Sequence, residues 1–192
     1  MRSTCWIALA LLATLTAVGA QAPSTPSTTW PGYRGQDRDG VYGESIRVSW
    51  EGLAPMWKKP VGGGRASFAV ADGRAFTIEQ RRQQEVVAAY DVMTGRELWT
   101  SAWQARFSQW MGGGEGPRAT PAWADGFVFA LGARGELRCL DAATGQPKWR
   151  VTLGSRLSVG VGSDGALVVV ASDEGEVFAL DTLDGTVRWR AR

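Results

Sequence analysis

Short apolar runs separated by polar turns recur along most of the chain and predict β-strands. Residues 127–131 read Phe-Val-Phe-Ala-Leu and residues 166–170 read Ala-Leu-Val-Val-Val. Successive apolar positions of this kind are typical of strands in a sheet that is covered on both faces. The run after the last turn of each unit is polar instead, at residues 96–98, 146–148 and 186–188. Polar residues, and the proline at 147, favour an outer edge strand that is protected against pairing with other chains.

The last turn of each unit repeats in a fixed register. Residues 89–99 (AYDVMTGRELW) return as residues 139–149 (CLDAATGQPKW) and residues 179–189 (ALDTLDGTVRW). In each copy the Asp can accept a backbone N–H and tighten the bend, and the Gly four positions later can adopt a positive φ. The residues at these two positions are Asp91 and Gly95, Asp141 and Gly145, and Asp181 and Gly185.

Four short strands in about 40–50 residues, with an apolar interior and a polar rim, predict one blade of a β-propeller. We expect the Trp that ends each unit to lie on the neighbouring blade and join the two sheets, with one indole N–H to satisfy. These residues are Trp57, Trp99, Trp149 and Trp189. The competing interpretation is a β-sandwich with ordinary core tryptophans, which the repeated register disfavours.

The A-x-D-x-x-T-G-x-x-x-W pattern resembles the repeat of the pyrroloquinoline-quinone-like (PQQ-like) eight-bladed β-propellers. That family includes PQQ-dependent alcohol dehydrogenases, BamB of the outer-membrane β-barrel assembly machinery, and exported proteins of unassigned role. The third unit, residues 156–192, is similar to BamB. Residues 30–40, 68–71 and 116–121 are more similar to the unassigned exported proteins.

The chain divides into three parts. Residues 1–20 have a positive start, a short apolar core and small residues at the end, which indicate a cleaved signal peptide and a periplasmic or secreted protein. Residues 21–49 are interpreted as a linker and extended segment, and residues 50–192 as about three to three and a half propeller blades. Because a closed eight-bladed ring needs about twice this length, we expect an incomplete ring with open, apolar terminal faces. Either the chain is a fragment or several chains complete one ring, and the open faces favour self-association.

The composition argues against most catalytic chemistry. The sequence contains no His, which removes Ser–His and Cys–His pairs and His-ligated zinc. Once the signal peptide is removed, Cys139 is the remaining cysteine; it lies in an apolar strand, which indicates packing, and no cysteine is placed to accept a lipid anchor. A net charge of +2 without a basic stripe disfavours nucleic-acid binding, and no later segment is apolar enough to cross a membrane.

The PQQ-dependent members raise the alternative of an oxidoreductase. The resemblance implies that such enzymes place an adjacent Cys pair over the quinone and hold calcium with carboxylate and amide groups. This sequence has no Cys-Cys pair and no Asn, so we expect no enzyme, cofactor or metal. A PQQ- and calcium-dependent oxidoreductase, or a degenerate relative, remains the alternative. We interpret four carboxylates as solvated loop residues: Glu79, Glu115, Asp37 and Asp39.

Residues 103–118, here called the candidate binding region, lengthen the interval between Trp99 and Trp149. The region is aromatic and glycine-rich, and its residue types are those enriched at partner hot spots. The candidate contact residues are Trp103, Arg106, Phe107, Trp110 and Arg118. The alternative is a long connection whose aromatic rings pack on a neighbouring blade. We expect a non-enzymatic scaffold that binds protein partners of the cell envelope, and the resemblance implies outer-membrane assembly components.

Overall fold

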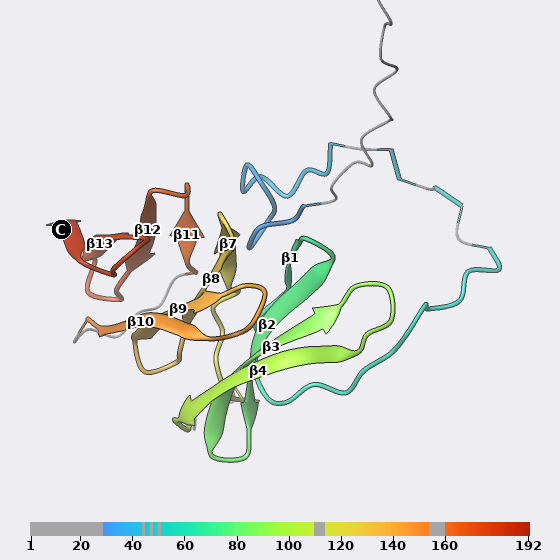
Figure 1. Cartoon of the computed structure of the whole chain (residues 1–192), viewed down its shortest axis with the longest axis horizontal. Coiled ribbons are helices and arrows are strands. Elements are labelled where there is room, and N and C mark those ends of the chain that lie inside the picture. Colours follow the sequence, from blue (N-terminus) through green and yellow to red (C-terminus); the bar gives the residue numbers. More distant parts are fainter. Residues whose placement is uncertain (1–28, 44, 47, 50, 110–113, 154–159) are drawn as a thin grey trace, which may run out of the picture.

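The computed structural model describes residues 29–192 except positions 44, 47, 50, 110–113 and 154–159. These described residues form three four-stranded antiparallel sheets and one two-stranded hairpin, without a helix (Figure 1). The predicted all-β fold with four-stranded blades is therefore confirmed, and the β-sandwich alternative is wrong. In the same part of the chain, no helix is long and apolar enough to cross a membrane. The predicted signal peptide, residues 1–20, lies outside the described residues.

The strands of each blade follow one another in chain order. Blade 1 contains β1 (Ala69–Ala71), β2 (Arg74–Arg81), β3 (Gln84–Asp91) and β4 (Glu97–Gln104). Blade 2 contains β7 (Ala122–Ala124), β8 (Phe127–Leu131), β9 (Glu136–Asp141) and β10 (Pro147–Thr152). Blade 3 contains β11 (Gly162–Ser163), β12 (Leu167–Ala171), β13 (Val177–Asp181) and β14 (Val187–Ala191). The hairpin of β5 (Ser108–Gln109) and β6 (Gly114–Glu115) separates blades 1 and 2 in sequence.

The first strands of the blades gather at the hub of the arrangement. In Figure 1, β1, β7 and β11 lie near one another, and both β1 and β11 contact β7. The last strand of each blade pairs with the third through one register shift close to its tryptophan. The chain thus runs outward from hub to rim three times, as in consecutive propeller blades.

An apolar core fills each of the two junctions between blades. Between blades 1 and 2, Phe76 and Ile78 of β2 pack with Val128 and Leu140 of blade 2. The core between blades 2 and 3 is formed in the same way by Phe129, Leu131, Leu137, Val170, Phe178 and Leu180. The side chains that alternate along each strand face opposite neighbours, which explains why the sequence runs are apolar at successive positions.

The face of blade 1 that points away from blade 2 is covered, so the expectation of an open apolar face there is wrong. Residues 57–68 lie on this face. The Gly62 N–H donates to the Glu79 carboxylate, and the Thr77 hydroxyl donates to the Ser67 carbonyl at 3.2 Å. Thr77 and Glu79 are 4% and 3% exposed. At the other end of the arc, blade 3 leaves apolar side chains exposed, as expected.

Residues 29–43, here called the N-terminal strap, cross the hub edge of all three blades. Trp30 and Val70 of β1 exchange backbone hydrogen bonds of 2.7 and 2.8 Å, and the Trp123 N–H of β7 donates to the Pro31 carbonyl at 2.7 Å. Arg38 Nη2 reaches the Val161 carbonyl next to β11 at 3.5 Å. This part of the predicted linker is therefore attached to blades 1 and 2 by main-chain bonds and to blade 3 by the Arg38 side chain.

Candidate functional site

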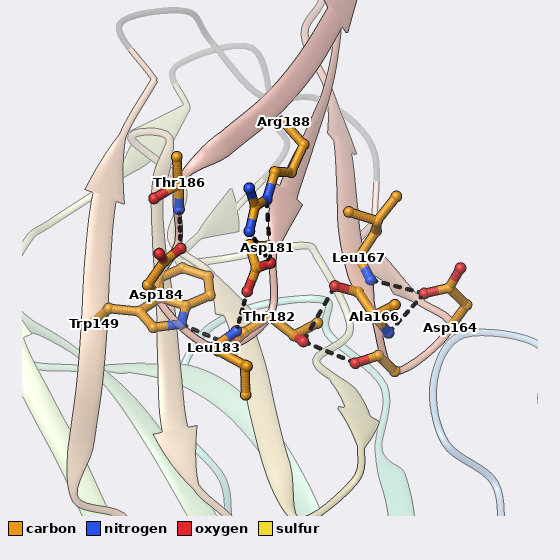
Figure 2. Close-up of polar contacts among 11 residues, drawn as sticks. Trp149, Asp164, Ala166, Leu167, Asp181, Thr182, Leu183, Asp184, Thr186 and Arg188 are labelled. Atoms are coloured by element: carbon orange, nitrogen blue, oxygen red, sulfur yellow. Dashed lines mark hydrogen bonds and ion pairs between the residues drawn. The ribbon is translucent and has the colours of Figure 1, made fainter.

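A tryptophan lies on one turn of every blade: Trp57 from the segment that covers blade 1, and Trp99 and Trp149 from the preceding blade. The three turns, here called the docking turns, are residues 91–95, 141–145 and 181–185. In every case the indole N–H donates to the carbonyl of the residue after the Asp: Trp57 to Val92 at 2.8 Å, Trp99 to Ala142 at 3.0 Å, and Trp149 to Thr182 at 2.9 Å. Figure 2 shows the third of these contacts.

Glycine is required where the ring meets the docking turn. Gly145 has a φ of +74°, and a Cβ added to it would lie 2.5 Å from the Trp99 ring. A Cβ at Gly95 would clash with the Trp57 ring in the same way, and a Cβ at Gly185 with the Trp149 ring. The fourth tryptophan, Trp189, is 46% exposed and has no docking turn in the described residues.

The aspartates of the first two docking turns hold the bend together. Asp91 Oδ1 accepts hydrogen bonds from the Thr94 hydroxyl and the Thr94 N–H, both at 2.8 Å. Asp141 accepts the same pair from Thr144 at 2.9 and 3.0 Å. These bonds hold the pKa of both carboxyls below the usual value, and the bond from the Thr hydroxyl has the largest effect.

The docking turn of blade 3 is built differently. Asp184 takes the place of the Thr, and its carboxylate accepts the Thr186 N–H at 2.8 Å. Asp181 pairs with Arg188 at 2.7 Å, and this bond lowers the pKa of the Asp181 carboxyl (Figure 2). All three turns thus use their polar groups internally, which marks them as structural.

The base of the candidate binding region is fixed by the buried amide of Gln80. Gln80 Nε2 donates to the carbonyls of Arg82, Gln84 and Ala105 at 3.1, 3.0 and 2.9 Å. Its Oε1 accepts the Phe107 N–H at 3.4 Å. One side chain therefore joins the β2–β3 turn to the start of the region.

The other strand of the hairpin is held at a close backbone approach. The Gly116 N–H donates to the Phe107 carbonyl at 2.9 Å. With a φ of +88°, Gly116 packs against the Gly63 carbonyl so closely that a Cβ would clash. Beyond this base, Arg106 and Glu115 form an exposed ion pair of 2.7 Å.

The structure separates the candidate contact residues into different environments. Trp103 is 7% exposed and belongs to the core between blades 1 and 2. The Arg138 guanidinium carbon lies 4.3 Å from the centre of the Trp103 ring. Phe107 is half-buried, Arg118 is exposed, and Trp110 lies outside the described residues. Partner contact by this region stays a prediction. Because Trp103 is buried, that contact would have to be made by the other candidate residues.

The interpretation of Glu79 as a solvated loop carboxylate is wrong. Glu79 lies on β2 and accepts hydrogen bonds from Arg81 at 2.6 Å and from the Tyr90 hydroxyl at 3.1 Å. Burial, followed by the charge of Glu79, raises the pKa of Tyr90 to about 12. Burial alone would lower the pKa of Arg81, but hydrogen bonds to Glu97 and Glu79 hold it above its usual value. The other three loop carboxylates, Glu115, Asp37 and Asp39, are exposed as expected.

A second buried carboxylate, Glu85, was not signalled by the sequence. It lies on β3 with an exposed fraction of 0%, and its Oε1 accepts the Ala133 N–H of blade 2 at 2.8 Å. Its Oε2 has no hydrogen-bond partner and packs against Gly132. Burial raises the pKa of this carboxyl above its usual value.

The environment of Cys139 and the placement of the described carboxylates bear on the redox and metal alternative. Cys139 is fully buried, and burial raises the pKa of its thiol to about 12, so the thiolate is scarce at neutral pH. Within the part of the chain that the structure describes, no three His, Cys, Asp or Glu side chains are placed to hold a metal ion. These residues do not fit the ligand set that the resemblance implies for PQQ and calcium.

Comparison with known proteins gives a consistent family. The family model described as outer membrane protein assembly factor BamB matches residues 82–192. BamB of Burkholderia pseudomallei (strain K96243) is 37% identical over 100 residues, which cover 52% of this chain and 24% of that protein. BamB of Escherichia coli (strain K12) is 35% identical over 82 residues, which cover 38% of this chain and 21% of that protein. The chain therefore spans about a quarter of the length of these relatives.

Among solved structures, the quinohemoprotein alcohol dehydrogenase from Comamonas testosteroni is similar with a TM-score of 0.58. The similarity covers 85% of this chain and 27% of that one, at 20% sequence identity. At this identity the comparison shows the fold alone.

Proposed function

Because the chain belongs to the family of outer membrane protein assembly factor BamB, we propose that it is a non-enzymatic propeller that binds protein partners in the cell envelope. The proposed partner class is a component of outer-membrane protein assembly, which is what the curated relatives are named for. In this proposal the protein is periplasmic or secreted after removal of residues 1–20.

The candidate binding region is the observation that carries the proposal. Its hairpin stands on a base that Gln80 ties to blade 1, while Arg106 and Ser108 remain exposed. The described residues of this base are already held by hydrogen bonds, so they lose less conformational entropy when a partner binds. Arginine and aromatic residues are enriched at the residues that dominate such binding.

Site-specific photocrosslinking in intact cells tests this function. A benzoyl-phenylalanine at Ser108 samples the hairpin, and the same residue at Met93 is the matched control. Met93 is 67% exposed and lies on a docking turn, at the opposite end of blade 1. We expect the Ser108 derivative to crosslink to an outer-membrane assembly component, and the Met93 derivative to give no such product.

A surface variant sharpens this test. Arg106→Ser should reduce the crosslink yield severalfold while leaving the melting temperature nearly unchanged, because an exposed ion pair contributes only about 0–1 kcal/mol. Identical products from both positions, or none from Ser108, would contradict the proposal.

A further inference from the structure

A pocket lies between the N-terminal strap and blade 3, away from the candidate binding region. Its volume is about 420 Å³, within the range of small-molecule sites. Tyr33 and Arg38 line it from the strap, and Val161, Val169 and Ala171 line it from blade 3. A smaller pocket of about 240 Å³ adjoins it and shares Arg38. The strap therefore creates a concave surface that the blades alone do not have.

Arg38 is held at this pocket by its backbone and by a glycine. Its φ is +58°, in the left-handed region that residues other than glycine seldom adopt. The guanidinium lies so close to Gly162 that a Cβ there would clash with it. Among the described residues, the side chain donates one hydrogen bond, to the Val161 carbonyl at 3.5 Å. Most of the five guanidinium N–H donors are thus left for other acceptors.

The charge of Arg38 is not neutralised by the described carboxylates. None of the ion pairs in the described residues includes Arg38. Asp39 accepts the Val41 N–H at 2.8 Å, and Asp164 accepts the Leu167 N–H at 2.8 Å. Asp39 and Asp164 are thus hydrogen-bonded to backbone, and Asp37, the neighbour of Arg38 in sequence, forms no ion pair with it in the described residues.

We propose that this pocket binds a carboxylate that carries an apolar body. The guanidinium of Arg38 matches a carboxylate with paired N–H donors, and Val169 and Ala171 contact the apolar body. Asp164 lines the adjoining pocket. Its negative charge favours a monoanion over a more highly charged phosphate. The ligand is either a small free acid or the carboxyl terminus of a polypeptide.

Amide chemical shifts of the ¹⁵N-labelled full chain distinguish these two sources. The three probes are octanoate, an acetylated Ala-Ala-Leu peptide with a free carboxylate, and the same peptide as its amide. We expect a carboxylate probe, and not the amide, to shift the N–H signals of Gly160, Gly162 and Val169. A response to octanoate alone assigns a small acid, and a response to the peptide alone assigns a chain terminus. No shift at these signals, or an equal shift with the amide peptide, would overturn the proposal.

Matched variants identify the groups responsible. Arg38→Gln should weaken binding of the active probe roughly tenfold, the usual effect of losing a charge-assisted hydrogen-bond pair. Arg96→Gln makes the same charge change on the exposed docking turn of blade 1 and should have no effect. Ala171→Leu fills the pocket without changing its charge and should also weaken binding. Because it lies on blade 3, it provides an independent check in case Arg38→Gln disturbs the strap. Unchanged affinity in both Arg38→Gln and Ala171→Leu would refute the assignment.

Discussion

Two buried carboxylates lie on opposite faces of blade 1 and are stabilised to different degrees. Glu79 is surrounded by donors from Arg81, Tyr90 and a backbone N–H. Glu85 Oε1 accepts one backbone N–H, and the Trp103 side chain also favours the charged form, but Oε2 has no hydrogen-bond partner among the described residues. A buried charge is tolerated when it is paired, and is costly when its oxygens are left unsatisfied. The first carboxylate therefore supports the fold, whereas the second opposes it when ionised.

Glu85→Gln should stabilise the protein increasingly as the pH rises. The pKa of the Glu85 carboxyl is raised in the folded state, so between the unfolded and folded pKa values the native protein binds more protons. The free energy of unfolding of the wild type therefore falls as the pH rises through this window. The amide cannot ionise and is not subject to this loss. Urea unfolding from about pH 4 to neutral pH, starting near the usual Glu pKa, should show a growing advantage for the variant.

A matched substitution on the other face of blade 1 provides the control. Glu79→Gln removes the charge that pairs with Arg81, so it should lower the free energy of unfolding at neutral pH. If Glu85→Gln is equally destabilising, the orphan oxygen of Glu85 is not the cost inferred above.

At the scale of elements, the docking turns of blades 2 and 3 each join two sheets through one ring and one glycine. Gly145→Ala and Gly126→Ala are a matched pair because both glycines have positive φ, +74° and +80°. Each substitution carries the conformational cost of about 1–2 kcal/mol for an L-residue in this region. At Gly126 nothing lies within 4 Å of the added Cβ, whereas at Gly145 it meets the Trp99 ring at 2.5 Å.

Gly145→Ala should therefore cost more than its control. Displacement of the Trp99 ring also loses the 3.0 Å bond to Ala142, which adds about 1 kcal/mol or more. Denaturant unfolding measures the difference between the two variants. Equal losses would show that the ring is free to move and that docking contributes little to the junction.

The sequence predicted these elements well where the interactions are local. The Asp, Thr and Gly of a docking turn lie within five residues, so their spacing carries the information. The base of the candidate binding region could not be read in this way. Gln80 contacts Ala105 across 25 positions, and nothing near Gln80 in the sequence marks it as an anchor. Likewise, Trp103 has the residue type of a hot spot, and its burial depends on contact with the next blade.

At the scale of the whole molecule, the two ends of the arc differ. Residues 57–68 cover blade 1, whereas Val187 and Trp189 of blade 3 are 41% and 46% exposed. The N-terminal strap then crosses the hub edge of all three blades. Its glycine- and proline-containing sequence resembles a linker because main-chain atoms make its attachments to blades 1 and 2. Backbone hydrogen bonds leave no pattern of apolar side chains in the sequence.

Deleting residues 29–43 should loosen the hub edge without unfolding the blades. Trp123 donates its N–H to Pro31, and Val70 donates its N–H to Trp30, so both amides lose their acceptors. Loss of about 1 kcal/mol per bond should speed hydrogen exchange at these two positions roughly fivefold. The amides of Cys139 and Leu140 lie inside blade 2 and should keep their protection. Unchanged exchange at Val70 and Trp123 would mean that the strap does not hold the hub. A uniform increase that includes Cys139 and Leu140 would instead make the strap part of the cooperative core, since amides that open together report global unfolding.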